Sequence, residues 1–225
     1  MGMAYLFKFA SPSLGLQADP VAALPLLHRV ATVATVATPQ HAFIFGRLLL
    51  SKLPPDEIRA PLPSNALAHF VPAGSTVVLE GWKYMERAAH LGHELSQFLV
   101  GEAYRTAQPP FLVQDPLLSI HYYSLASQQG KMEADMGLSI WFLHGSPGED
   151  GLEKDPVLAF MFAKKAAKKG LPMAELTMGF CAEEGIGCPK SLQTTIEWYK
   201  KAKEHGNSVA AERLNALSQS SPNAL

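Results

Sequence analysis

Small and apolar residues recur at helical spacing in three stretches of the chain, each about four turns long. Asp115, Asp155 and Ser191 each precede one of these stretches. The residues four, seven, eight and eleven positions after each of them are small or aromatic, except that the first of the four is a hydroxyl residue in two of the stretches. At about 100° per residue these positions share one stripe. They read Ser119, Tyr122, Tyr123 and Ala126, then Ala159, Phe162, Ala163 and Ala166, then Thr195, Trp198, Tyr199 and Ala202. The pattern predicts three amphipathic helices, called B helices below.

Each predicted B helix begins at a capping residue and ends at a glycine. Asp and Ser are favourable N-caps because their side-chain oxygen accepts a hydrogen bond from a free backbone N–H. Proline follows two of the caps, where it is tolerated because the N–H that it lacks would have no partner in the first turn of the helix. Glycine just beyond a helix accepts the left-handed conformation that ends it. These glycines are 38, 40 and 36 residues apart, at Gly92, Gly130, Gly170 and Gly206.

A second helix, called the A helix, is predicted to start about four residues after each glycine. A small residue follows five positions later, and an aromatic residue follows at the eighth position in two of three cases. Small residues let helix axes approach closely, and aromatic rings fill the space between turns. The chain is therefore predicted to be all-α, an α-solenoid of antiparallel helix pairs that winds into a right-handed superhelix. The repeat positions include Ala134, Ala174, Gly101, Gly179, Tyr104, Phe142, Gly130, Gly170, Gly206, Asp115, Asp155, Trp198 and Tyr199.

The pattern weakens toward the N-terminus, which suggests the domain organisation. A B helix is predicted after Asp19, an A helix over 41–52 and a partial A helix over 1–10. The prolines that follow are too dense for a helix interior, so a loop is predicted there. The predicted boundaries are 1–52 for degenerate helical repeats, 53–76 for the proline-rich loop, 77–217 for the main repeat array and 218–225 for a polar tail.

Composition excludes several classes of function. Hydrophobic residues make up 48% of the chain and charged residues 17%, which is enough apolar material for a core. A net charge of −1 argues against a nucleic-acid binder driven by bulk charge. No apolar run reaches the roughly 20 residues of a membrane span, and the N-terminus lacks the pattern of a secretory signal. A cytoplasmic location is expected, with mitochondrial import less favoured despite the mildly basic stretch 1–55.

No residues with catalytic, metal-binding or cofactor-binding spacing stand out. His90 and His93 are three apart but flank a predicted turn without a third ligand, so we expect solvent-facing histidines. Cys181 and Cys188 are expected to be free thiols, although a disulfide between them stays open. The glycine-rich run at 185–191 follows no strand and lacks the spacing of a phosphate-binding loop. The chain is predicted to be a non-enzyme without cofactor or metal.

Residues 174–207 resemble a Sel-1-like repeat. The family pattern is a small residue, a glycine five positions on, glycine-x-glycine, a cap, and a Trp-Tyr helix that ends in small residues and glycine. Residues 93–130 and 134–171 match it less fully. The resemblance implies a scaffold that binds proteins and has no catalytic role. The matching residues are Ala174, Gly179, Gly185, Gly187, Ser191, Trp198, Tyr199, Ala202 and Gly206.

Within this class, residues 133–176 are similar to the fungal chitin synthase activator branch. The resemblance implies a protein partner, chitin synthase or its targeting factors, together with peripheral membrane contact and no transmembrane segment. The concave surface of the array is expected to bind a partner segment, with 53–76 as a further contact. An adaptor in protein quality control or mitochondrial assembly is the alternative, and an enzyme is a distant one.

Lysines gather off the apolar stripe of two B helices. If the repeats stack, these lysines align into a basic ridge. The ridge is either a solvated outer face or a contact for anionic lipid headgroups or an acidic partner. Its members are Lys164, Lys165, Lys168, Lys169, Lys200 and Lys201.

Overall fold

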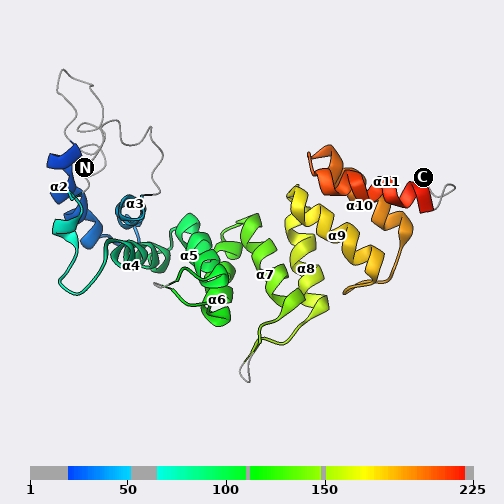
Figure 1. Cartoon of the computed structure of the whole chain (residues 1–225), viewed down its shortest axis with the longest axis horizontal. Helices are drawn as coiled ribbons and strands as arrows, with labels where there is room; N and C mark the ends of the chain where they lie inside the picture. Colours follow the sequence, from blue (N-terminus) through cyan, green and yellow to red (C-terminus); the bar gives the residue numbers. More distant parts are fainter. Residues whose placement is uncertain (1–19, 52–64, 110–111, 148–150, 221–225) are drawn as a thin grey trace, which may run out of the picture. The chain divides into compact units, whose positions relative to one another are not determined.

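The computed structural model describes residues 20–51, 65–109, 112–147 and 151–220, and most of them lie in helices (Figure 1). Within these residues there is no β-strand, only an isolated bridge between Gln108 and Leu112. The predicted all-α repeat fold is confirmed. The B helices are α2 (Pro20–Thr32), α4 (Val77–His90), α6 (Pro116–Gln128), α8 (Pro156–Ala167) and α10 (Leu192–Glu204). The A helices are α3 (Gln40–Leu49), α5 (Glu94–Thr106), α7 (Met132–His144), α9 (Pro172–Glu184) and α11 (Ser208–Ser220), and a short 3₁₀ helix, η1, spans Ala68–Phe70.

The chain divides into two compact units, and the division falls within α5. Unit 1 ends at Val100 and also takes in Gln108–Val113, whereas unit 2 comprises Gly101–Ala107 and the chain from Gln114 onward. Unit 1 has a core between α2 and α3, which includes Leu24, Leu27, Ala31, Phe45, Leu48 and Leu49. Unit 2 contains α6 to α11 and the surfaces described below.

The B helices of unit 2 begin at the residues whose side chains cap them. A side-chain oxygen accepts a hydrogen bond from the backbone N–H three residues on, at 2.9 Å for Asp115, 2.9 Å for Asp155 and 3.3 Å for Ser191. Each cap therefore satisfies one of the free donors at the helix start. Beyond the helix ends, the backbone takes φ angles of +100°, +81° and +88° at Gly130, Gly170 and Gly206.

Two tyrosines of the B helices pack on glycines of the A helices. A Cβ atom on Gly101 would lie 2.8 Å from Cδ1 of Tyr123, and one on Gly179 would lie closer than 2.5 Å to two ring carbons of Tyr199. Both rings are fully buried. The ring of Tyr123 also covers Gly137 of α7, a position the repeat pattern did not single out. Glycine is needed here because any side chain would occupy the volume of the ring.

The helix pair α7–α8 solves the same packing problem with different residues. At the position of the two tyrosines α8 carries Ala163, and at the position of the glycines α7 carries Ser139. Both residues are buried, and Ser139 Oγ donates a hydrogen bond to the carbonyl oxygen of Ala159 at 2.8 Å. Glycine thus occurs opposite the large ring, and serine occurs where the ring is missing.

Several predicted boundaries differ from the structure or lie outside it. The A helices α7 and α9 begin two residues before Ala134 and Ala174, and α11 runs three residues beyond 217. The predicted partial helix over 1–10, the first half of the predicted loop over 53–76 and the last five residues lie outside the described residues. The four-part domain organisation stays a prediction.

Candidate protein-binding face of the A helices

One side of α9 is buried and the other carries accessible apolar side chains. Ala174, Met178 and Ala182 are buried, whereas Phe180 is half-buried and Met173 is 53% exposed. Met173 and Phe180 are seven residues apart, which is close to two helical turns, so they lie along one side of the helix.

The neighbouring helix α7 presents a matching apolar strip. Met136, Ile140 and Leu143 are half-buried and follow one another at spacings of four and three residues. The Thr177 hydroxyl of α9 lies 4.0 Å from the sulfur of Met136, so the two helices come into contact at this point. Met136, Ile140, Leu143, Met173 and Phe180 are called the A face below.

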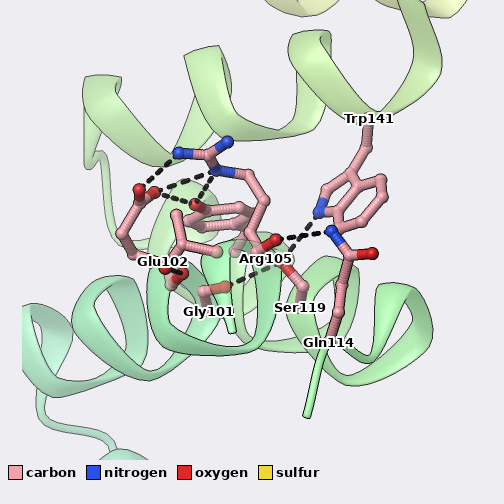
Figure 2. A network of polar contacts seen from close by, with 8 residues as sticks. Gly101, Glu102, Arg105, Gln114, Ser119 and Trp141 are labelled. Carbon is pink, nitrogen blue, oxygen red and sulfur yellow. Dashed lines mark hydrogen bonds and ion pairs between the residues drawn. The ribbon is translucent and has the colours of Figure 1, made fainter. Parts of the chain in front are cut away.

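A polar cluster occupies the equivalent positions of α5, at one border of the A face. Glu102 and Arg105 lie 38 residues before Ile140 and Leu143. In Figure 2 the Arg105 guanidinium lies against the Glu102 carboxylate. Arg105 Nε donates to Glu102 Oε2 at 3.1 Å and to the Tyr123 hydroxyl at 3.3 Å, and this hydroxyl donates to Glu102 Oε2.

The electrostatics of this cluster favour a charged carboxylate. Burial raises the pKa of Glu102, but hydrogen bonds from Arg105 and Tyr123 outweigh it and leave this pKa below its ordinary value. Burial, and then the adjacent carboxylate, raise the pKa of Tyr123 far above its ordinary value, so the phenol keeps its proton. The cluster is an ion pair that carries a neutral hydroxyl donor.

A second polar cluster, formed by residues of α9, α10 and α11, lies at the other border. The Tyr199 hydroxyl donates to Glu183 Oε2 at 2.6 Å, and an Arg213 guanidinium nitrogen lies 3.8 Å from the same oxygen. Burial and the neighbouring carboxylate raise the pKa of Tyr199. The A face is therefore an apolar strip between two groups of the same composition, each with one carboxylate, one arginine and one tyrosine.

Hydrogen bonds between helices hold the first cluster in place. Trp141 Nε1 of α7 donates to Ser119 Oγ at 2.8 Å, and Ser119 Oγ donates to the carbonyl oxygen of Gly101 at 2.7 Å (Figure 2). The Gln114 amide donates to the carbonyl oxygen of Arg105 at 2.8 Å. These bonds connect α5 with α6 and α6 with α7, so the first cluster is held in place before any partner binds.

The aromatic repeat positions form stacked pairs within unit 2. Tyr104 lies parallel to Tyr122 with ring centroids 6.2 Å apart, and Phe142 lies parallel to Phe162 at 5.7 Å. Ala134 and Ala174 are fully buried, and Trp198 packs against the alanine-rich core between α8 and α9. These residues support the helix pairs and do not contribute to the A face.

Two lysines of the predicted basic ridge belong to a buried ion network. The Asp135 side chain has no exposed surface, and its carboxylate lies 2.8 Å from Lys165 Nζ and 3.0 Å from Lys169 Nζ. Ser127 Oγ donates to the same carboxylate at 2.6 Å. The network joins α6, α7 and α8, so Lys165 and Lys169 have a structural partner within the chain. Sequence spacing missed this network because Asp135 precedes the two lysines by 30 and 34 residues.

The other ridge lysines stay on the surface of α8 and α10. Lys164 Nζ lies 5.8 Å from the centroid of the Phe160 ring, and Lys201 Nζ lies 4.5 Å from that of Trp198. Lys168 and Lys200 are exposed. Contact of this ridge with a lipid or an acidic partner stays a prediction.

The remaining candidate residues have structural surroundings. His90 is exposed, but His93 is half-buried, stacks on Phe43 at 4.2 Å and accepts a hydrogen bond from Ser96 N, so the expectation of two solvent-facing histidines is wrong for His93. Both cysteines are free, and burial raises the pKa of Cys181 to about 11. Within the described ranges no three His, Cys, Asp or Glu side chains gather as a metal site, and no helix there is long and apolar enough to span a membrane.

Comparison with known proteins identifies the repeat. The model of the Sel1 repeat matches residues 77–93, 95–131, 133–171 and 172–207, which together make up more than half of the chain. The chain belongs to the Sel1 repeat family. The last three Sel1 matches correspond to the helix pairs α5–α6, α7–α8 and α9–α10, as the resemblance predicted.

Similar proteins extend this finding. The chitin synthase regulator SKT5 of Malassezia restricta is 39% identical over 134 residues, covering 60% of this chain and 9% of that protein. The chitin synthase regulator SKT5 of Saccharomyces cerevisiae is 35% identical over 165 residues, covering 72% of this chain and 23% of that protein. The chain thus spans less than a quarter of these relatives. A solved Sel1 repeat protein from Oxalobacter formigenes shares the fold, with a TM-score of 0.72 at 17% identity over 97% of this chain and 78% of that one.

Proposed function

We propose that this chain is a protein-binding part of a fungal chitin synthase regulator, that it acts as an adaptor without catalysis, and that its A face holds the partner. The names of the two SKT5 relatives support the choice of chitin synthase. The observation that carries the choice of surface is the apolar strip between the two clusters of Glu102–Arg105–Tyr123 and Glu183–Arg213–Tyr199.

The A face has the properties of a binding surface. Met173 is exposed and the other four side chains are half-buried, so a partner that covers the face removes their remaining apolar surface from water. The flanking arginines, tyrosines and carboxylates offer both hydrogen-bond donors and acceptors at the rim, which fix the register of a bound segment. Because the groups of each cluster are already paired with one another, little ordering is needed when a partner binds.

The proposed partner is a cytosolic segment of the synthase that carries apolar residues along one side. The proposed location is the cytoplasm, next to the membrane that holds the synthase. The adaptor contributes binding alone, because the titratable groups of the two clusters that flank the A face are engaged in ion pairs and hydrogen bonds with one another.

Isothermal titration calorimetry with the purified chain and cytosolic fragments of the host's chitin synthases tests this proposal. We expect one fragment to bind, and the variant Ile140→Gln/Phe180→Gln to weaken its affinity at least tenfold. The control variant Leu117→Gln/Val209→Gln changes two exposed apolar residues outside the A face and should bind like the wild type.

Two results would count against the proposal. If no synthase fragment binds to the wild-type chain, the partner is wrong. If a fragment binds equally well to the wild type and to the Ile140→Gln/Phe180→Gln variant, the partner is right but the A face is not the surface that holds it. Circular dichroism of both variants should match the wild type, so that unfolding is not taken for lost binding.

A further inference from the structure

The outer side of α8 forms a second surface, distinct from the A face. Val157, Met161, Lys164 and Lys168 follow one another at spacings of four, three and four residues. At about 100° per residue they lie within a stripe about 60° wide, on the opposite side of the helix from the buried Ala166. These four residues are called the α8 strip below.

The α8 strip has an apolar half and a basic half. Val157 is 57% exposed and Met161 is 58% exposed, so both present most of their apolar surface to water. Lys164 and Lys168 are also exposed, and within the described part of the chain neither makes an ion pair. They lie at the C-terminal end of α8, where the helix dipole favours positive charge.

The buried network around Asp135 separates the roles of the α8 lysines. Lys165 and Lys169 lean toward α7, where they neutralise the buried carboxylate. Lys164 and Lys168 lie on the outer side, and Lys164 is held near the surface by its contact with the Phe160 ring. Charge of one sign beside exposed apolar surface is complementary to a partner that combines apolar side chains with carboxylates.

The neighbouring B helices do not repeat the charge pattern of the α8 strip. At the equivalent positions α6 carries neutral or apolar residues, and α10 carries two carboxylates, Glu197 and Glu204, next to Lys200. An anionic bilayer would extend over α10 as well and meet these carboxylates, which repel its headgroups. A single helix, in contrast, can lie along α8 alone. The strip spans the twelve residues from Val157 to Lys168, a rise of about 16 Å, which corresponds to about three turns of a partner helix.

We propose that the α8 strip docks an amphipathic, acidic helix from a partner protein. The apolar residues of that helix cover Val157 and Met161, and its carboxylates pair with Lys164 and Lys168. This surface goes beyond the A face, because its partner differs in charge and the two surfaces lie on different helices. The chain would then bring together two protein segments.

Fluorescence anisotropy with the whole chain and synthetic peptides tests the docking. The probes are 18-residue helical peptides with leucines along one side. One peptide has three glutamates C-terminal to the leucines and the other has them N-terminal, so that a helix that binds parallel to α8 and one that binds antiparallel to it are both tested. A third peptide replaces the glutamates with glutamines. We expect one glutamate peptide to bind, and the glutamine peptide to bind at least tenfold more weakly.

Variants of the chain locate the binding. Lys164→Glu/Lys168→Glu and Val157→Ser/Met161→Ser should each weaken binding of the glutamate peptide at least tenfold. The matched control, Lys200→Glu/Lys203→Glu, makes the same charge change on α10 and should stay within twofold of the wild type. The A-face variant Ile140→Gln/Phe180→Gln should also bind the peptide normally, so this test does not depend on the A face.

Three results would overturn the proposal. The first is that neither glutamate peptide binds the wild-type chain. The second is that the Lys200/Lys203 variant loses as much affinity as the Lys164/Lys168 variant, which would indicate that bulk charge drives binding. The third is that vesicles of phosphatidylcholine and phosphatidylserine bind in a way that depends on Lys164 and Lys168 while the peptides do not bind, which would assign the strip to a membrane surface. Thermal midpoints of all variants should lie close to that of the wild type.

Discussion

The packing of Tyr199 on Gly179 predicts strong energetic coupling between these two positions. A Cβ atom at Gly179 would lie closer than 2.5 Å to two carbons of the Tyr199 ring, against about 3.5–4.0 Å for a normal carbon contact, an overlap of more than about 1 Å. The ring is fully buried and its hydroxyl is bonded to Glu183, so it cannot move aside freely. Gly179→Ala should therefore destabilise the protein by about 3 kcal/mol, the upper end for overpacking.

The double-mutant cycle makes this prediction quantitative. Tyr199→Ala alone should cost about 3–5 kcal/mol, as expected when a large buried ring is removed. In that background, Gly179→Ala meets no ring and should be neutral or stabilise by up to about 1 kcal/mol, because alanine favours a helix over glycine. The coupling energy is then about 3 kcal/mol. The pair Ser139 and Ala163 in α7–α8 is the natural counterpart of the double variant.

Urea unfolding followed by circular dichroism and by tryptophan fluorescence measures this cycle. Coincident transitions from both probes are needed, because repeat arrays can unfold in steps. Asn215→Ala is the matched control, since Asn215 holds the position of Gly179 in α11 and is exposed; its effect should stay within about 0.5 kcal/mol. A coupling energy below about 0.5 kcal/mol would refute the size complementarity.

Three further predictions concern stability. Lys165→Met/Lys169→Met leaves Asp135 buried without a cation and should lower the free energy of unfolding by about 3–5 kcal/mol. Asp135→Asn should lower it less, because the two lysines can turn to water, and urea unfolding of both variants measures the difference. Gly187→Ala should lower the thermal midpoint by several degrees, because φ at this position is +67° and the new Cβ would lie closer than 2.5 Å to the carbonyl oxygen of Pro156, the first residue of α8. An unchanged thermal midpoint would contradict this prediction. Burial lowers the pKa of His93 below its ordinary 6.5, so its stabilising contribution is present above about pH 6.5 and is lost as the pH falls through the folded-state value. His93→Asn replaces the Nδ1 acceptor of the Ser96 N–H with an amide oxygen, so the thermal midpoint of this variant should depend less on pH between pH 7.5 and 5.

The sequence was sufficient for features that depend on neighbours along the chain. The caps at Asp115 and Asp155 and the turn glycines act within a few residues, so local patterns reveal them. The buried stripes also follow from helical spacing, as Ala163 and Tyr199 illustrate. The all-α repeat fold was predictable for this reason.

Features that depend on contacts between helices were not predictable. Gly137 lies outside the repeat pattern, and only the structure shows that the Tyr123 ring covers it. Lys165 and Lys164 are adjacent in sequence and share a charge, yet one pairs with a buried carboxylate and the other faces water. The polar borders of the A face likewise combine residues from helices whose relative rotation no single-helix pattern specifies.

Hydrogen–deuterium exchange of the whole chain, with and without a bound cytosolic fragment of chitin synthase, tests the central claim most directly. The claim is that the A face of unit 2 holds the partner. We predict slower exchange in peptides from α7 and α9, with the largest change between Met136 and Leu143 and between Met173 and Phe180. Protection confined to α8 or to unit 1, or no protection when the fragment is bound, would contradict it.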